Sequence, residues 1–326
     1  MNKPLLTLAI PTFNRAELLD LCLSQAGPQI LQHREQVELL VSDNASTDHT
    51  AEIVAKHQAT GLPIHYLRND TNIGPDANFA QCLERADGTF LLIVGDDDVL
   101  LEGALDKLLP LLCDPEIGVV HIGCHPFRQD FKAERPRRAL SGKTQTYTDP
   151  RAFAAKVNVM FTFISGNVIN KSTLPADFSP QEYVGTNLIQ LSWTLTAALG
   201  AKRNLLLDEY LVAAKAENTG GYQLCRVFGT NMNEIFRRLE ARGADPECFR
   251  AINQKTLTTF FPKWILTLRS KGEKFTSEDH FDTLRPVFKD FPALWLMVWP
   301  SAKWPLPLAK LWLKLCRRGL KTLGKW

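Results

Sequence analysis

The chain has 326 residues, of which 45% are hydrophobic and 22% charged, a composition typical of a globular protein with a sizeable core. Seven scattered cysteines without a CxxC pair indicate buried thiols in a reducing compartment rather than a disulfide framework. The N-terminus lacks a signal-peptide pattern, and no apolar run reaches the ~18 residues of a membrane-spanning helix. We therefore expect a cytoplasmic or peripheral protein.

The first 125 residues alternate between strand and helix patterns. Strands are predicted at 5–13, 37–43, 63–68, 89–95 and 118–124, and helices at 15–26, 48–59, 76–86 and 102–113. Buried apolar strands that alternate with amphipathic helices predict an α/β fold, with a Rossmann-like, mostly parallel sheet and helices on both faces.

The rest of the chain is predicted to be mainly helical. Residues 126–150 have the composition of a long basic and polar loop, and further patterns predict a helix at 151–160, a strand at 161–170, a helix at 186–199 and one or two strands within 204–214. We predict one α/β domain over 1–220, with halves 1–125 and 126–220, then a helical extension over 221–291 and a basic tail over 292–326.

Polar clusters follow three of the predicted strands: Pro11-Thr12-Phe13-Asn14-Arg15, Ser42-Asp43-Asn44 and Gly95-Asp96-Asp97-Asp98. Pro11 is expected to end the first strand. Ligands of open α/β sheets bind at the carboxyl ends of the strands, and these ends share one edge of the sheet. The sequence thus predicts one ligand site that is built from all three clusters.

The three adjacent aspartates are the most informative part of this predicted edge. Neighbouring carboxylates repel one another and resist burial, so a compensating cation is expected. Hard divalent cations prefer carboxylate oxygens together with phosphate oxygens, which favours a metal and diphosphate site. The alternative is a helix cap, although capping needs one carboxylate rather than three.

The other polar residues are individually ambiguous. Asp43 could accept hydrogen bonds from a base or a ribose, or it could form an Asx-turn. Arg15 could meet a phosphate or stack on a base, or remain solvated. The turn with Asn72 and Gly74 leads into a predicted helix N-terminus, which suits an anion.

Taken in order, AIPTFNR, VSDNASTDHT, RNDTNIGPDANF and DGTFLLIVGDDD resemble family 2 glycosyltransferases of the GT-A fold, over roughly residues 5–115. The IGPDANF and GDDDVL variants are most similar to bacterial transferases of surface-polysaccharide synthesis, abequosyltransferase-like members included. The resemblance implies a nucleotide-diphosphate-sugar donor, with a UDP-sugar favoured, a Mn²⁺ or Mg²⁺ ion and inversion at the anomeric carbon.

The resemblance also implies roles for individual residues. Those that would build the nucleotide-sugar site are Pro11, Thr12, Asn14, Arg15, Asp43, Asn72, Asp96 and Asp97, where Asp97 would support the turn rather than contact the ligand. Asp98 would coordinate the metal, with Asp96 as the second metal candidate. Ser165, Gly166 and Asn167 resemble the wall of the sugar pocket.

The catalytic base departs from the family pattern, because the acidic pair of many members is missing from SPQEYVGTNLIQLSW. Glu182 is the nearest carboxylate and Asp177 the next, so both are candidate bases for the acceptor hydroxyl. A solvated loop position is the alternative for Glu182. Asp208, Glu209 and Glu217 are reserves, and His121 and His125 are expected to be a core and a loop histidine.

The tail combines basic and aromatic residues. Residues 293–326 hold seven Lys or Arg and no acidic residue, so residues 1–292 carry −4 of the total charge of +3. Five of the seven tryptophans also lie there. A basic helix with Trp and Leu opposite its charges fits an in-plane membrane helix, while a core helix with a solvated basic face is the alternative. Nucleic acid is not expected, because the tail is too apolar.

The preferred interpretation is an inverting, metal-dependent glycosyltransferase of surface-polysaccharide synthesis. It would act on a lipid-linked oligosaccharide at the inner face of the plasma membrane, held by residues 292–326. A catalytically silent GT-A domain that serves as a membrane-bound scaffold is the alternative. A nucleotidyltransferase is disfavoured, because PTFNRAELL is not a Gly-rich basic loop.

Overall fold

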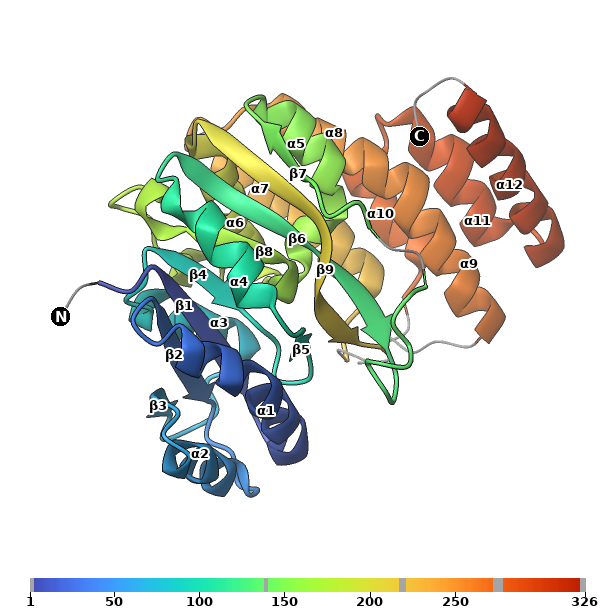
Figure 1. The fold of residues 1–326 in the computed structure, drawn as a ribbon. Helices are drawn as coiled ribbons and strands as arrows, with labels where there is room; N and C mark the ends of the chain where they lie inside the picture. Colours follow the sequence, from blue (N-terminus) through green and yellow to red (C-terminus); the bar gives the residue numbers. More distant parts are fainter. Residues whose placement is uncertain (1–2, 138–139, 217–220, 272–277, 323–326) are drawn as a thin grey trace. The chain divides into compact units, whose positions relative to one another are not determined.

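The computed structural model describes residues 3–137, 140–216, 221–271 and 278–322. The chain divides into two compact units, which we call the sheet unit (Met1–Phe153 and Met160–Asn218) and the helical unit (Ala154–Val159 and Thr219–Trp326). Figure 1 shows the sheet in the first unit and the helices of the second. Glu217, a reserve candidate for the base, lies outside the described residues.

The sheet unit is built on one mixed sheet in the order β3-β2-β1-β4-β8-β6-β9-β5, with β7 paired to β9. The strands are β1 (Leu6–Thr12), β2 (Val37–Asp43), β3 (Ile64–Arg68), β4 (Phe90–Ile93), β5 (Val99–Leu100), β6 (Ile117–Phe127), β7 (Thr144–Tyr147), β8 (Asn167–Asn170) and β9 (Arg203–Lys215). The β3-β2-β1-β4 half is parallel, while β8 runs antiparallel to β4 and β6. The predicted α/β fold is confirmed.

Helices cover both faces of the sheet, as predicted (Figure 1). They are α1 (Ala16–Gln32), α2 (Thr50–Ala59), α3 (Pro75–Arg85), α4 (Ala104–Leu108), α5 (Pro150–Val157) and α6 (Ile189–Gly200). Alternate residues of β1, Leu6, Leu8 and Ile10, pack into one core with apolar residues of α1, α2 and α4. Helices α3 and α6 pack against each other, α3 also contacts β1 and β2, and α6 also contacts β6 and β8.

Pro11 does not end the first strand, contrary to expectation. It lies inside β1, opposite Ser42 of β2, and β1 continues to Thr12. The Ala9 carbonyl accepts from the Val94 N–H, so Pro11, two residues further on, faces the same side of the strand. The pairing of β4 with β1 ends at Ile93, opposite Ala9. No residue of β4 therefore lies opposite Pro11, and the N–H that proline lacks breaks no hydrogen bond between the strands.

Two further predictions need correction in the middle of the chain. Residues 158–166 form short 3₁₀ turns, so only Asn167–Asn170 of the strand predicted at 161–170 is extended. The predicted loop 126–150 is partly strand, because β6 runs to Phe127 and β7 pairs antiparallel with β9. These segments carry no clear two-residue alternation, and their pairing depends on distant strands: β8 pairs with β4 and β6, and β7 pairs with the long strand β9.

The helical unit packs around its own apolar core. Its helices are α7 (Met232–Ala241), α8 (Pro246–Lys255), α9 (Phe261–Lys271), α10 (His280–Phe288), α11 (Trp299–Lys303) and α12 (Leu306–Thr322), with π-helical turns at Arg226–Asn231, Thr256–Phe260 and Leu294–Val298. Leu294 and Val298 are fully buried in this core beside Phe261 and Phe288. Part of the basic tail therefore belongs to the core. No helix among the described residues is long and apolar enough to span a membrane.

Candidate active site

The three predicted clusters meet at the carboxyl edge of the parallel half-sheet. The register places Thr12 of β1 beside Asp43 of β2, and the Asp96–Asp98 turn follows β4 on the other side of β1. The turn is closed by a 2.9 Å hydrogen bond from the Asp98 N–H to the Gly95 carbonyl. A Cβ atom at Gly95 would lie 3.0 Å from Asp97 Oδ1, so glycine permits the aspartates to fold back on the turn.

Asp96 is held by the loop that follows β1. Its Oδ2 accepts from the Thr12 hydroxyl at 2.8 Å, and its Oδ1 accepts from Arg15 Nη1 at 3.0 Å. The same Arg15 nitrogen lies 3.2 Å from Asp97 Oδ2. Burial raises the pKa of Asp96, although Arg15 and Thr12 oppose the shift. Arg15 thus ties two of the three aspartates to the start of α1.

Asp98 points to a different part of the sheet. Its Oδ2 accepts from the Ser165 hydroxyl at 2.5 Å, and its Oδ1 accepts from the Lys215 N–H at 2.9 Å. Ser165 in turn accepts from the Gly95 N–H at 2.9 Å. Burial, followed by the charge of Asp97, raises the pKa of Asp98 to about 7. A buried carboxylate with this pKa would gain from a nearby cation.

The ligand atoms that this turn offers fit a hard divalent cation, because they include carboxylate oxygens. Two neutral donors bind Asp98 and leave lone pairs on both of its oxygens. Asp96 instead already faces a guanidinium. In the described parts of the chain, the aspartates do not form a group of three convergent ligands. This divergence favours Asp98 over Asp96 as the metal ligand.

Asp43 is fully buried and engages both of its oxygens. Its Oδ1 accepts from the Ser46 N–H at 2.8 Å, which forms the Asx-turn that was the alternative to a nucleotide contact. Its Oδ2 accepts from the Tyr66 hydroxyl at 2.6 Å. Arg68 Nε lies 3.7 Å from Oδ2. Burial and Asp43 together raise the pKa of Tyr66, so its hydroxyl remains a donor. Asp43 is thus rigid, and its contact with a nucleotide stays a prediction.

The remaining nucleotide-site candidates shape the rim of this edge. Asn14 is exposed in a left-handed conformation with φ 52°, and its side-chain oxygen accepts from the Thr47 N–H at 2.7 Å. Asn72 accepts from Asn44 Nδ2 at 2.9 Å. Buried Asn44 also accepts from the Ile73 N–H, so it anchors the loop before α3. The edge therefore brings together the loops after β1, β2, β3 and β4.

The candidate bases lie apart from this aspartate cluster. Glu182 is an exposed residue of the 3₁₀ turn Pro180–Tyr183, which packs on α3 and α6, and Asp177 is exposed just before this turn. The adjacent Gln181 donates to Glu84, near the end of α3 that faces away from the carboxyl edge. Asp208 accepts from Ser141, and Glu209 pairs with Lys107. The role of Glu182 or Asp177 as base stays a prediction.

Asp76, which the sequence did not single out, organises the segment where the family's acidic pair is missing. It lies in the first turn of α3, and its Oδ2 accepts from the N–H groups of Gly185 and Asn187 at 2.8 and 2.9 Å. Burial raises the pKa of Asp76, although these hydrogen bonds act to lower it. An acidic residue in a first helical turn is common, so the sequence held no signal of this long-range contact.

The histidines of β6 differ from expectation in one case. His121 contacts Asn167 Oδ1 through Nδ1 at 2.9 Å. His125 is not a loop residue, because it lies within β6, is 1% exposed and packs edge-on against Tyr210. Burial lowers the pKa of both histidines. Neither makes a described hydrogen bond to the aspartates.

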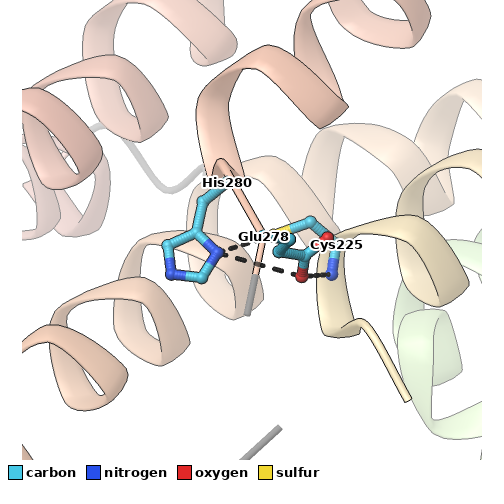
Figure 2. Close-up of side chains that lie close together, drawn as sticks. All are labelled: Cys225, Glu278 and His280. Atoms are coloured by element: carbon cyan, nitrogen blue, oxygen red, sulfur yellow. Dashed lines mark hydrogen bonds and ion pairs between the residues drawn. The ribbon is translucent and has the colours of Figure 1, made fainter. Parts of the chain in front are cut away.

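A second cluster of potential ligands lies in the helical unit, where Cys225, Glu278 and His280 approach one another (Figure 2). His280 Nδ1 lies 3.8 Å from both Cys225 Sγ and Glu278 Oε1. Both Glu278 oxygens accept from the N–H groups of Cys225 and Arg226, at 2.6 and 3.2 Å. Burial, with Glu278 next, raises the pKa of Cys225 well above its usual range. The cluster is thus a helix cap beside a protonated thiol.

Comparison with known proteins places the chain in a family. Residues 7–174, which contain every candidate at the carboxyl edge, match the family described as glycosyl transferase family 2. The chain belongs to glycosyl transferase family 2. This family 2 chain is 38% identical over 198 residues to an abequosyltransferase of Salmonella typhimurium, covering 56% of the chain and 58% of that relative.

A second relative is a Campylobacter jejuni GalNAc(5)-diNAcBac-PP-undecaprenol beta-1,3-glucosyltransferase, 36% identical over 107 residues. That match covers 32% of the chain and 34% of the relative. The chain thus spans between a third and three fifths of these two curated relatives. Their similarity therefore concerns parts of these proteins rather than whole proteins.

Solved structures with the same fold extend over nearly the whole chain. S. aureus TarS 1–349 in complex with UDP-GlcNAc superimposes with a TM-score of 0.61 at 17% identity, covering 96% of this chain and 92% of that one. A Pyrobaculum calidifontis mannosyltransferase in complex with GDP-Man and Mn²⁺ gives 0.53 at 15% identity, over 96% and 85%. At these identities the comparison shows the fold, which is GT-A.

Proposed function

We propose that this chain is an inverting glycosyltransferase of bacterial surface-polysaccharide synthesis that uses a nucleotide-diphosphate sugar and a divalent cation. The observation that carries the proposal is the Asp96–Asp98 turn, where Asp98 is buried with a pKa of about 7 and Asp96 is bound to Arg15. Family membership and the similarity to an abequosyltransferase support the reaction class. The proposed catalytic domain is residues 1–220.

Asp98 is the residue that would hold Mn²⁺ or Mg²⁺, with the diphosphate of the donor supplying further oxygens. The bound ion would neutralise the negative charge that develops on the departing diphosphate. Arg15 lies beside Asp96 and Asp97, and 38% of its side chain is exposed, so it would be the residue that meets a phosphate. Asp43 and Thr12 would line the nucleoside side. We propose a UDP-sugar as the donor, since S. aureus TarS, which has the same fold, forms a complex with UDP-GlcNAc.

Calorimetry tests this site directly. UDP titrated into the full chain should bind with Mn²⁺ present and far more weakly after chelation. A panel of UDP-, GDP-, CDP- and dTDP-sugars with Mn²⁺ should then show hydrolysis or transfer for at least one donor. Metal-dependent UDP binding without turnover of any donor would instead support the alternative, a silent sugar-nucleotide-binding scaffold, for which the missing acidic pair is the motivation.

The acceptor hydroxyl needs a base on the face of the sugar opposite the diphosphate. We keep Glu182 and Asp177 as the proposed bases, because they lie closest in sequence to the position of the family's acidic pair. The variants Glu182→Gln and Asp177→Asn separate them: the true base should lose kcat by ~10²–10⁴-fold while donor binding is retained. Unchanged kcat in both variants would exclude both residues.

We further propose that the protein works at the inner face of the plasma membrane on a lipid-linked oligosaccharide. Within the described part of the chain, six of the eleven large exposed hydrophobic residues lie between Trp295 and Leu315. Leu308, Leu311 and Leu315, each at least half exposed, recur at spacings of three and four on one side of α12. The relative whose name contains a polyprenyl diphosphate acceptor supports the same class of substrate.

Substitution tests this membrane proposal better than truncation does, because Leu294 and Val298 belong to the core of the helical unit. The double variant Leu311→Ser with Leu315→Ser should stop co-sedimentation with anionic vesicles. Leu31→Ser with Met160→Ser, two exposed positions of the sheet unit, is the matched control and should bind like the wild type. Equal binding of both double variants would contradict the proposal.

A further inference from the structure

A cavity of about 430 Å³ opens between α9 and α12, two helices of the helical unit that contact each other. Seven residues line it: Lys263, Leu266, Lys310, Leu313, Lys314, Arg317 and Arg318. Its volume lies within the range of about 300–1,000 Å³ that is usual for small-molecule sites. The reaction proposed above does not use this cavity.

The lining is strongly cationic, with five Lys or Arg and no acidic residue. Lys310, Lys314 and Arg317 follow one another at spacings of four and three on α12, and Lys263 faces them from α9. Among the described residues, no carboxylate forms an ion pair with Lys263, Lys310 or Lys314. Converging like charges repel, so a multivalent anion would stabilise this arrangement.

The floor of the cavity is apolar. Leu266 and Leu313 are 6% and 5% exposed and pack with Met297 and Ala309. The exposed side of α12 with Leu308 and Leu311 is contiguous in the helix with the basic side. Burial also lowers the pKa of Arg317, so an anion beside it would offset part of that cost. The cavity thus offers cations and apolar surface to one ligand.

We propose that this cavity binds the phosphomonoester or diphosphate head group of a membrane lipid, whose hydrocarbon chain lies along the exposed leucines of α12. The three lysines without a described ion-pair partner exceed the single charge of a phosphodiester, which favours a head group with two or more negative charges. The apolar floor and the leucines favour a lipid over a free anion. The inference rests on the proposed membrane association and adds a head-group preference to it.

Vesicle binding by the full chain tests this head-group preference. Vesicles of phosphatidylcholine carry either phosphatidic acid, a phosphomonoester, or phosphatidylglycerol, a phosphodiester, at matched surface charge. The wild type should bind the phosphatidic acid vesicles at least ~10-fold more tightly, whereas diffuse attraction depends on surface charge alone. Inorganic pyrophosphate should compete for this preference.

Charge-matched variants assign the preference to the cavity. Lys310→Gln with Lys314→Gln should remove it, while Lys310→Arg with Lys314→Arg should keep it. Arg250→Gln with Lys289→Gln removes two charges elsewhere in the helical unit and should leave the preference intact. A preference that survives in the Lys310/Lys314 glutamine variant would overturn the assignment.

The outcomes separate this inference from the membrane proposal. Equal binding of both vesicle types by the wild type would overturn the head-group site and leave membrane association standing. Pyrophosphate binding without a vesicle preference would identify a free-anion site and overturn the lipid as occupant. Failure to bind any anionic vesicle would overturn both proposals.

Discussion

Replacement of Asp98 by asparagine should make the metal-free protein more stable while it removes metal-dependent donor binding. Asp98 is 5% exposed, and burial with the charge of Asp97 raises its pKa from an ordinary 3.8 to about 7. A folded-state pKa above the unfolded one means that the folded protein binds the proton more tightly. The wild-type free energy of unfolding therefore loses this contribution as pH rises from about 4 to about 7.

The shift of about three pKa units corresponds to about 4 kcal/mol, at about 1.4 kcal/mol per unit. The introduced asparagine keeps the size of the side chain and can still accept from Ser165 or Lys215, but it carries no charge. Urea unfolding at pH 5 and pH 8 should therefore show the D98N variant gaining about 3 kcal/mol on the wild type, because about two of the three pKa units lie between pH 5 and the folded-state pKa of about 7. Below pH 4 the two proteins should converge.

With metal and nucleotide present, the wild type should become more stable than the D98N variant. Mn²⁺ with UDP should raise the unfolding midpoint of the wild type and leave that of D98N unchanged, since binding stabilises only the state that binds. Asp97→Asn removes one charge from the same turn and should retain metal-dependent UDP binding in calorimetry. A stability difference between wild type and D98N that does not vary with pH, or Mn²⁺-dependent UDP binding by D98N, would refute the reasoning.

Three further substitutions probe the supports of the site. Ser165→Ala leaves the Gly95 N–H unpaired, so it should lower the free energy of unfolding in urea by ~1–3 kcal/mol and weaken Mn²⁺-dependent UDP binding ~10–100-fold. The control is Ser192→Ala, because the Ser192 hydroxyl donates to a helical carbonyl, and this variant should retain UDP binding. Tyr66→Phe deprives buried Asp43 of its 2.6 Å donor and should lower stability by ~1–3 kcal/mol, with a parallel loss of UDP affinity in calorimetry. Asp76→Ala should cost more than ~2 kcal/mol in urea unfolding, because two N–H groups lose their acceptor, and unchanged stability would show that solvent replaces it.

Much of the site could be predicted because its residues follow strands in a fixed order. The parallel pairing of β1 with β2 and β4 alone brings Thr12, Asp43 and the Asp96–Asp98 turn to one edge. The short patterns around these strands therefore carried both the family and the meeting of these polar residues at one edge of the sheet. The base could not be found in this way, because it depends on a segment whose acidic pair is absent.

The sequence by itself determined the α/β alternation, the polar strand ends and the basic, Trp-rich tail, since each of these is a local pattern of residue types. Only the tertiary structure decided which oxygen meets which donor: it bound Asp96 to Arg15, joined Asp98 to Ser165 and Lys215, and placed Asp76 under the loop before α6.

The tail shows the same division. Composition predicted a basic amphipathic helix, but packing split α12 into a buried side with Ala309 and Leu313, a cationic side that faces Lys263, and an exposed row of leucines. These contacts join residues far apart in the chain, and their free energy depends on burial and partner charge, which no local pattern encodes.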